Sequence, residues 1–529
     1  MSDFLPHYQK VDPTTWAYLS SLLIIGLFFK FNRFWSVRNL DLVLLILLAP
    51  GMILTHKGYQ QLLSTPPPPE SVIERPPTAA PRENSINGTE STETPKTIGD
   101  SELAEKQLLP PGITRAIALV RWGFLGLLGI SLIWLVRLLF DPTMMRRPLL
   151  EPNLSVGGML FIGVWLYFFL MANVITGQPG TLDLELEGSK GAKKMLAEIS
   201  RKPAEGTNAN ENQIGVEPVQ SSLEKPHGAL DAAQQYRSHG PGYYFLHTLP
   251  RIATISFARG QQQEERTLII TSKVMAILSQ LAIIIGMVVV GYWHFDNIRM
   301  GIGAATLYLM LPYTAQMSGH VDHVLPAALV LWAVVFYRHP LYAGMILGLG
   351  MGTSYFALYL LPLWISFYWQ RGLFRFLLGV GCSLAVLAGL LALTSDSPLS
   401  FWRKFQAMFG LWSMAMDNLR GIWDARLGGW APEYRKPILA TFVVLSGFFA
   451  AWPAQKNLGT LLSCSAAVMV AAQFWHGYDG GLFIAWYMPL TLLTVFRPNL
   501  EDRIALTVLG EGWFPRSRLS RMSHLDRAA

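Results

Sequence analysis

The residues best suited to chemistry gather in three polar segments, each beside an apolar run. The first is acidic and contains Asp183, Glu185 and Glu187, just after the apolar run 154–176. A carboxylate just beyond an apolar run of membrane-spanning length can act as a general base on a substrate near the membrane surface. We expect Asp183, or its neighbour Glu185, to be catalytic. A solvated acidic loop is the alternative interpretation.

The second segment, 236–244, reads Tyr-Arg-Ser-His-Gly-Pro-Gly-Tyr-Tyr and leads into an apolar run that ends at 258. It places a cation, an imidazole and phenol groups directly before a run that is able to enter a membrane. Ionisable residues near a membrane are costly unless they are paired or functional. We therefore expect Arg237, His239 and Tyr243 to bind a substrate.

The third segment, His320-Val321-Asp322-His323, lies between two apolar runs. Two imidazoles and a carboxylate at this spacing could bind a substrate phosphate or a divalent cation. The cation would be Mg²⁺ or Mn²⁺, with His320 and Asp322 as candidate ligands. The alternative is a polar loop at a helix start, where the negative charge of Asp322 is favoured by the helix dipole.

Sequence signatures of common soluble enzymes are absent. The chain contains no Gly-x-x-x-x-Gly-Lys-Ser/Thr loop, no Cys-x-x-Cys pair and no His-Glu-x-x-His segment. Its two cysteines, Cys382 and Cys464, both lie in apolar runs. A free cysteine in such a place behaves as a small core hydrophobe, so a disulfide framework is excluded.

The elements that must position these segments are membrane helices. Of the 529 residues, 51% are hydrophobic and 15% are charged, whereas an average soluble domain carries roughly 25% charged residues. Apolar runs recur along the chain, and a spanning helix needs about 20 mostly apolar residues. The sequence predicts an all-α, polytopic transmembrane protein with about 12–13 spans.

The runs divide the chain into seven parts. We expect an N-terminal membrane hairpin (1–54), a disordered Pro-rich outer loop (55–111), a third span with a cytoplasmic loop (112–153), a transmembrane core with a long outer loop at 177–240 (154–394), an outer interfacial segment (395–436), C-terminal spans (437–497) and a basic cytoplasmic tail (498–529). The outer loop 55–111 contains four consecutive prolines and too few apolar residues to form a core.

The charge distribution predicts the orientation. Lys and Arg occur mainly in short loops that fall on one side if the N-terminus is outside and the C-terminus inside. The net charge of +7, from 42 basic and 35 acidic residues, forms no stripe, so we expect no nucleic-acid partner. The predicted location is the inner or plasma membrane, with the lipid bilayer as a partner.

The segment 399–429 shows a helical stripe of large apolar side chains, which predicts a helix that lies flat at the outer surface. Basic residues, among them Arg403 and Lys404, flank this stripe. Such a helix suits the membrane interface. Packing of the stripe on the protein's own spans is the alternative. The stripe consists of Phe401, Phe405, Met408, Trp412, Met416 and Leu419.

The order of these features over 154–369 resembles the GT-C superfamily, integral-membrane glycosyltransferases that use polyprenyl-phosphate sugars. Asp183 falls where that family has its catalytic acid. The segment 240–243 resembles the family's entry to the next span, and Arg266 resembles its Arg before a span. Pro312, Gly319 and Asp322 fall on its second outer loop. No Asp-x-Asp is present.

The resemblance implies transfer of a hexosyl or pentosyl group from a polyprenyl-phosphate donor to an acceptor on the outer face. It implies that Arg237, Arg403 and Lys404, with Arg420 and Arg435, bind the lipid phosphate. It also makes 241–258 a span, puts Arg266 inside, and turns 298–313 into a re-entrant or outer-lying segment.

Two other functions stay open. One is a transporter or flippase of lipid-linked or small hydrophilic solutes, although the sequence shows few charges within spans and no internal repeat. The other is a non-catalytic relative of the glycosyltransferases.

Overall fold

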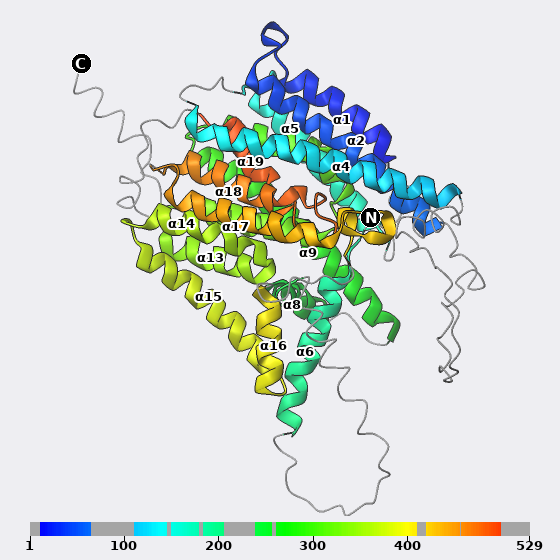
Figure 1. The fold of residues 1–529 in the computed structure, drawn as a ribbon, viewed down its shortest axis with the longest axis vertical. Coiled ribbons are helices and arrows are strands. Elements are labelled where there is room, and N and C mark those ends of the chain that lie inside the picture. The colour runs from blue at the N-terminus through cyan, green and yellow to red at the C-terminus, as the bar shows by residue number, and fades with distance from the viewer. Residues whose placement is uncertain are drawn as a thin grey trace, which may run out of the picture.

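The computed structural model describes residues 11–64, 111–144, 150–178, 184–205, 239–255, 261–409, 419–454 and 456–498. These ranges form an all-α fold without a β-strand (Figure 1), which confirms the predicted class. Within them, five segments are long and apolar enough to cross a membrane, and they identify a membrane protein. The predicted total of about 12–13 spans stays a prediction. The five are Val37–Ser64, Gly112–Thr143, Val156–Thr176, Glu264–Trp293 and Leu373–Leu393.

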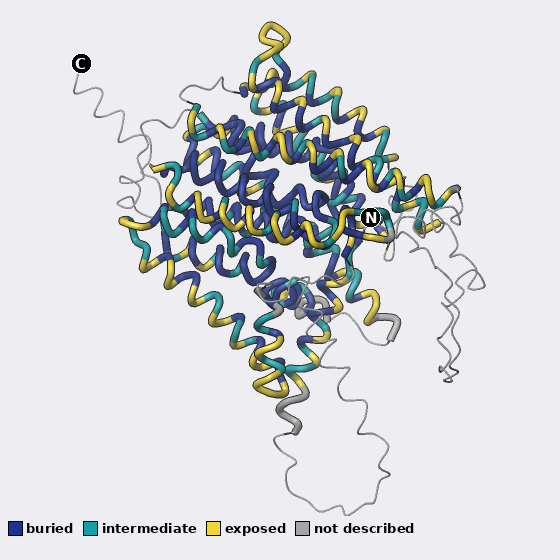
Figure 2. Tube along the Cα trace, viewed as in Figure 1, coloured by how far each residue is buried: buried dark blue, intermediate teal, exposed yellow. Residues whose placement is uncertain are grey.

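Most of the helices lie side by side in one bundle, and its middle is the most deeply buried part of the chain (Figure 2). Helix α18 (Leu458–Ala472) is buried along its whole length. The remaining helices of the bundle are α1 (Pro13–Phe28), α2 (Val37–Ser64), α4 (Pro111–Phe140), α5 (Val156–Thr176), α9 (Gln261–Trp293), α10 (Ile298–Met310), α12 (Val321–Val335), α13 (Pro340–Thr353), α14 (Leu361–Tyr368), α15 (Leu373–Leu393), α17 (Arg435–Ala451) and α19 (Met488–Phe496).

Several helices of the bundle begin with a side chain that caps their first main-chain N–H groups. The carboxylate of Asp12 accepts from the main-chain N–H of Thr14 at 2.9 Å at the start of α1. The hydroxyl of Ser155 accepts from Gly158 at the start of α5. Asn457 and Thr460 form a reciprocal capping box on α18. These side chains satisfy backbone donors that a helix start leaves unpaired.

Glycines allow neighbouring helices to approach closely. A Cβ on Gly344 of α13 would lie 2.2 Å from the carbonyl oxygen of Phe376 on α15. A Cβ on Gly379 of α15 would lie 2.2 Å from the carbonyl oxygen of Leu341 on α13. Close backbone contact through small residues is the usual way that membrane helices associate.

A buried ionic network ties the ends of three helices together, at the end of the bundle where α2 begins. Arg137 of α4 binds Asp41 of α2 at 2.9 Å and Asp141 at 3.0 Å. Arg497, which follows α19, binds the other oxygen of Asp141 at 2.8 Å. Burial of charges is tolerated here because each is paired.

Helix α8 (Pro241–Ile255) corrects one topological prediction. Within the part of the chain that the structure describes, it is not among the apolar helices of membrane-spanning character, and in Figure 1 it is seen nearly along its axis while α17 and α18 lie across the view. Near its C-terminal end, Arg251 lies 3.9 Å from Glu264, in the first turns of α9. The described part of the predicted span, 241–255, is therefore wrong as a span, and Arg266 lies close after Glu264 in the part of α9 that contacts α8.

Helix α10 corrects a second prediction. Every residue from Met300 to Met310 is buried, and α10 packs tightly against the preceding helix α9. A Cβ on Gly291 of α9 would lie 2.5 Å from the Cα of Gly301 of α10. The segment is thus part of the bundle core rather than outer-lying.

Two further helices, α6 (Glu187–Glu205) and α16 (Pro398–Phe409), run across the direction of α17 and α18 (Figure 1). Helix α6 lies within the predicted loop 177–240.

Helix α2 continues ten residues past the predicted end of the hairpin at 54. The Pro-rich part of the predicted outer loop, Trp412 and Met416 of the apolar stripe, and the basic tail from 499 on lie outside the described residues.

The apolar stripe of α16 packs inward. Met408 is 2% exposed and joins a core cluster with Leu387 and Leu391 of α15. Phe401 and Phe405 pack against the same cluster. This supports the alternative in which the stripe covers the protein's own helices. The predicted continuous helix is also wrong at its far end, because Leu419 lies outside any helix.

Candidate functional site

The three polar segments predicted from the sequence meet at one end of the bundle, here called the site end. The first lies between α5 and α6 and ends at the first residue of α6, and the second runs into the first turn of α8. The third follows the short helix α11 (Pro312–Gln316) and runs from the N-cap of α12 through its first turn. Glu185, His239 and Asp322 represent the three segments at this meeting point. Residues about 50 to 140 positions apart in the chain therefore share one site.

Glu185 is the centre of the site. The hydroxyl of Tyr243, in the first turn of α8, donates to both of its carboxylate oxygens, at 2.9 and 2.7 Å. The main-chain N–H of Asp322 donates to Oε2 at 3.2 Å. The Nε2 atom of His239 lies 3.9 Å from Oε1. One carboxylate therefore joins all three segments.

The electrostatics of Glu185 and His239 are coupled. Burial raises the pKa of Glu185 to about 7, and the negative charge of Asp322 contributes in the same direction. Burial opposes the charged form of His239, but the nearby carboxylates of Glu187, Glu185 and Asp322 raise its pKa to about 9. At neutral pH the site thus holds a carboxyl group that can exchange a proton beside a positively charged imidazole.

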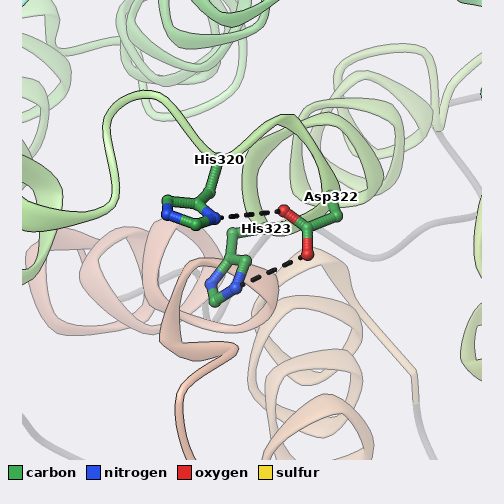
Figure 3. A group of neighbouring side chains, drawn as sticks. All are labelled: His320, Asp322 and His323. Carbon is green, nitrogen blue, oxygen red and sulfur yellow. Dashed lines mark ion pairs between the residues drawn. The ribbon is translucent and has the colours of Figure 1, made fainter. Parts of the chain in front are cut away.

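The third segment forms a compact group of two imidazoles around one carboxylate (Figure 3). The Nδ1 atom of His320 lies 3.8 Å from Oδ1 of Asp322, and Nε2 of His323 lies 3.7 Å from Oδ2. The indole N–H of Trp486 donates to the main-chain oxygen of Asp322 at 3.1 Å. Two groups at the site therefore have a donor set that suits a metal: His320, Asp322 and His323, and Glu185, Glu187 and His239.

Other predicted site residues have different outcomes. Asp183 and Arg237 lie outside the described residues. Lys404 is 3% exposed, and its ammonium group donates to the carbonyl oxygen of Thr394 at 2.6 Å and to Glu198 of α6 at 3.3 Å. This cation therefore joins α16 to α6, which fits a structural role better than the predicted binding of a substrate phosphate. Arg403 is exposed on α16.

The segment 473–486, between α18 and α19, contributes residues that the sequence analysis did not select. The ring of Phe483 stacks on His323, with centroids 4.3 Å apart, and lies 4.6 Å from the ring of His476. Burial lowers the pKa of His476 to about 3, so this imidazole is neutral. The available signal was a polar loop, His476-Gly477-Tyr478-Asp479, between two apolar runs.

Asp479 connects the same loop to the N-terminal hairpin. The hydroxyl of Tyr59, on the last turns of α2, donates to its carboxylate at 2.7 Å. Asp479 has a positive φ of 54°, a conformation that Asn and Asp adopt more readily than most residues. The N-terminal hairpin thus reaches the loop that supports the site.

Comparison of this chain with protein-family models, with characterised proteins and with solved structures finds no match.

Proposed function

We propose that this protein is a membrane glycosyltransferase that moves a sugar from a polyprenyl-phosphate donor to an acceptor at the outer face of a membrane. The observation that carries the proposal is the meeting of Glu185, His239 and Asp322 at the site end of an apolar helical bundle. The resemblance to the GT-C superfamily assigned the same three segments to one active site. Their convergence supports that assignment.

Glu185 is the proposed general base. It would accept the proton of the acceptor hydroxyl while the acceptor oxygen attacks the anomeric carbon, and the bond from that carbon to the phosphate oxygen breaks. The bonds from Tyr243 and from the main chain of Asp322 hold the carboxylate in place. Asp183, two residues earlier, is the other candidate base.

The leaving polyprenyl phosphate needs a positive charge. His239 supplies one within the site, because the surrounding carboxylates keep its imidazole protonated. Arg237, two residues earlier, and Arg403, exposed on α16, are further candidates to bind the phosphate. Charge-assisted hydrogen bonds to phosphate oxygens are stronger than neutral ones.

The placement of buried charge favours an enzyme over a transporter. A buried ionic network around Arg137 and Asp141 lies at the end of α4 and near the beginning of α2. A transporter generally places its coupling residues near the middle of the bilayer. Within the described residues, this network is better explained as a contact that holds helix ends together.

The test is donor consumption by the reconstituted protein. Proteoliposomes are incubated with a panel of labelled polyprenyl-phosphate sugars, and release of polyprenyl phosphate is measured with membrane extract as the acceptor source. Glu185→Gln should reduce turnover about 10²–10⁴-fold, the usual contribution of a general acid or base. Binding of the donor should be nearly unchanged.

Glu198→Gln is the matched control, because Glu198 is also a partly buried glutamate but pairs with Lys404 on α16. It should keep turnover near that of the unmodified protein. Full activity of Glu185→Gln would move the role of base to Asp183. Movement of the intact donor across the bilayer without release of polyprenyl phosphate would instead identify a flippase.

A further inference from the structure

His323 is held in one orientation by contacts on its ring and at one ring nitrogen. The hydroxyl of Tyr313 lies 2.7 Å from Nδ1, and the ring of Phe483 stacks on the imidazole. The side chain is 6% exposed. The Nε2 atom lies 3.7 Å from Oδ2 of Asp322 (Figure 3). Metal-binding histidines typically have the other ring nitrogen fixed by a hydrogen bond in this way.

The distances around Asp322 fit two donors that share an ion better than they fit hydrogen bonds. Separations of 3.7 and 3.8 Å from Asp322 to the two histidines exceed the usual hydrogen-bond range. Metal–ligand bonds to His and Asp are about 2.0–2.2 Å, so two ligands of one ion lie roughly 3–4 Å apart. The Oδ1 atom of Asp322 is buried and accepts no hydrogen bond.

We propose that His320, Asp322 and His323 form a three-ligand site for a transition-metal ion of the zinc class. Three protein ligands with one open position for water or a substrate oxygen is the arrangement typical of catalytic zinc sites. Imidazole favours Zn²⁺ and related ions, whereas Mg²⁺ prefers oxygen ligands. The donor set therefore favours Zn²⁺ over the Mg²⁺ or Mn²⁺ expected from the sequence.

The neighbouring group of Glu185, Glu187 and His239 is less suited to be the primary metal site. The carboxylate of Glu185 already accepts hydrogen bonds from Tyr243 and from the main chain of Asp322. The side chain of Glu187 is 50% exposed. The proposal does not depend on glycosyl transfer, because metal binding is measured without donor or acceptor.

The experiment measures metal directly. The full chain in lipid nanodiscs is stripped with chelator, dialysed against Zn²⁺ or Co²⁺, and analysed for metal content and for the visible absorption of bound Co²⁺. About one ion per chain is expected, with the intense Co²⁺ bands of a low-coordinate site. Excess Mg²⁺ should not displace Zn²⁺.

The variants locate the site. His323→Gln and Asp322→Asn should lose the bound ion, and His320→Gln, at the more exposed ligand, should lose it without loss of folding. Tyr313→Phe keeps all three ligands and removes the hydroxyl that contacts Nδ1, so affinity should fall about 10–100-fold. His339→Gln is the matched control, because this histidine lies beyond the opposite end of α12.

Folding of each variant is checked by its elution volume and helical circular dichroism. Metal content no higher than in the dialysis buffer would overturn the proposal. An ion that is retained in folded His320→Gln and His323→Gln but lost in His239→Gln would also overturn it, by assigning the metal to the neighbouring group. Displacement of Zn²⁺ by equimolar Mg²⁺ would refute the zinc class.

Discussion

Single side chains at the site are held by partners from other segments of the chain. Glu185 lies in a short segment without regular structure, yet Tyr243 and the main chain of Asp322 fix its carboxylate. His323 is fixed in a comparable way by Tyr313 and Phe483. Residues held from several sides keep one geometry, which is the condition for preorganised chemistry.

Asp479 provides a test at the residue scale. Burial raises the pKa of its carboxyl group, while the Tyr59 hydrogen bond and Arg420 lower it. Asp479→Asn removes the buried charge but keeps an oxygen that can accept from Tyr59, and Asn tolerates the positive φ. At neutral pH the Asn variant should be at least as thermally stable as the unmodified protein.

The pH dependence of this difference follows from the raised pKa. The unmodified protein loses stability relative to the Asn variant as the pH rises above the pKa that Asp479 has in the unfolded chain. The loss is complete once the pH exceeds the pKa of Asp479 in the folded protein. Thermal melts in nanodiscs across acid to neutral pH measure it. Asp479→Ala, which lacks the acceptor, should be less stable than both. An Asn variant as unstable as the Ala variant at neutral pH would contradict the account.

At the scale of elements, close helix approach is what shapes the bundle beside the site. The pair α13 and α15 meets through Gly344 and Gly379, whose missing side chains let the two backbones touch. Helix α13 in turn contacts α8, because a Cβ on Gly240 or Gly242 would meet the main chain of Gly352. A change in the packing of α13 against α15 should therefore displace the start of α8, where Tyr243 lies.

Two glycines of α15 make a matched comparison. A Cβ on Gly379 would meet the carbonyl oxygen of Leu341, whereas a Cβ on Gly381 has nothing within 4 Å. Gly379→Ala should destabilise the protein by about 1–3 kcal/mol, the usual cost of overpacking. Gly381→Ala should be neutral or stabilise by up to about 1 kcal/mol through helix propensity. Thermal melts of the two purified variants give the answer, and equal melting temperatures would show that α13 and α15 are not in close contact.

At the scale of the whole molecule, the site end carries α6 and the opposite end carries the ionic network of Arg137. The Lys and Arg distribution predicts that the site end faces outward. Ser200 on α6 and Thr143 after α4 are exposed and lie toward these two ends. They allow a direct test of orientation.

In a background without the exposed Cys382, a cysteine at Ser200 should react with an impermeant thiol reagent on intact cells. A cysteine at Thr143 should react only after the membrane is permeabilised. Full denaturation of both variants controls for the chemical reactivity of each thiol. The reverse pattern would place the site in the cytoplasm and rule out chemistry at the outer face.

The sequence by itself determined the membrane class, the all-α fold and the three polar segments that meet at the site. These features are local, because an apolar run of sufficient length forms a helix in lipid whatever its neighbours are. The segments around Glu185, His239 and Asp322 were visible for the same reason. Each interrupts or borders an apolar run, where ionisable groups are costly.

Only the tertiary structure decided the orientation of α8, the burial of α10 and which residues complete the site. The composition of α8 and α10 left their positions open, because helix tilt and burial depend on contacts with neighbouring helices. By its sequence, the apolar stripe of α16 suited contact with lipid as well as contact with the protein's own helices. Its neighbours on α15 decided between the two. Phe483 and Trp486 reach the site because the segment before α19 packs against α12, a relation between distant parts of the chain that no local pattern contains.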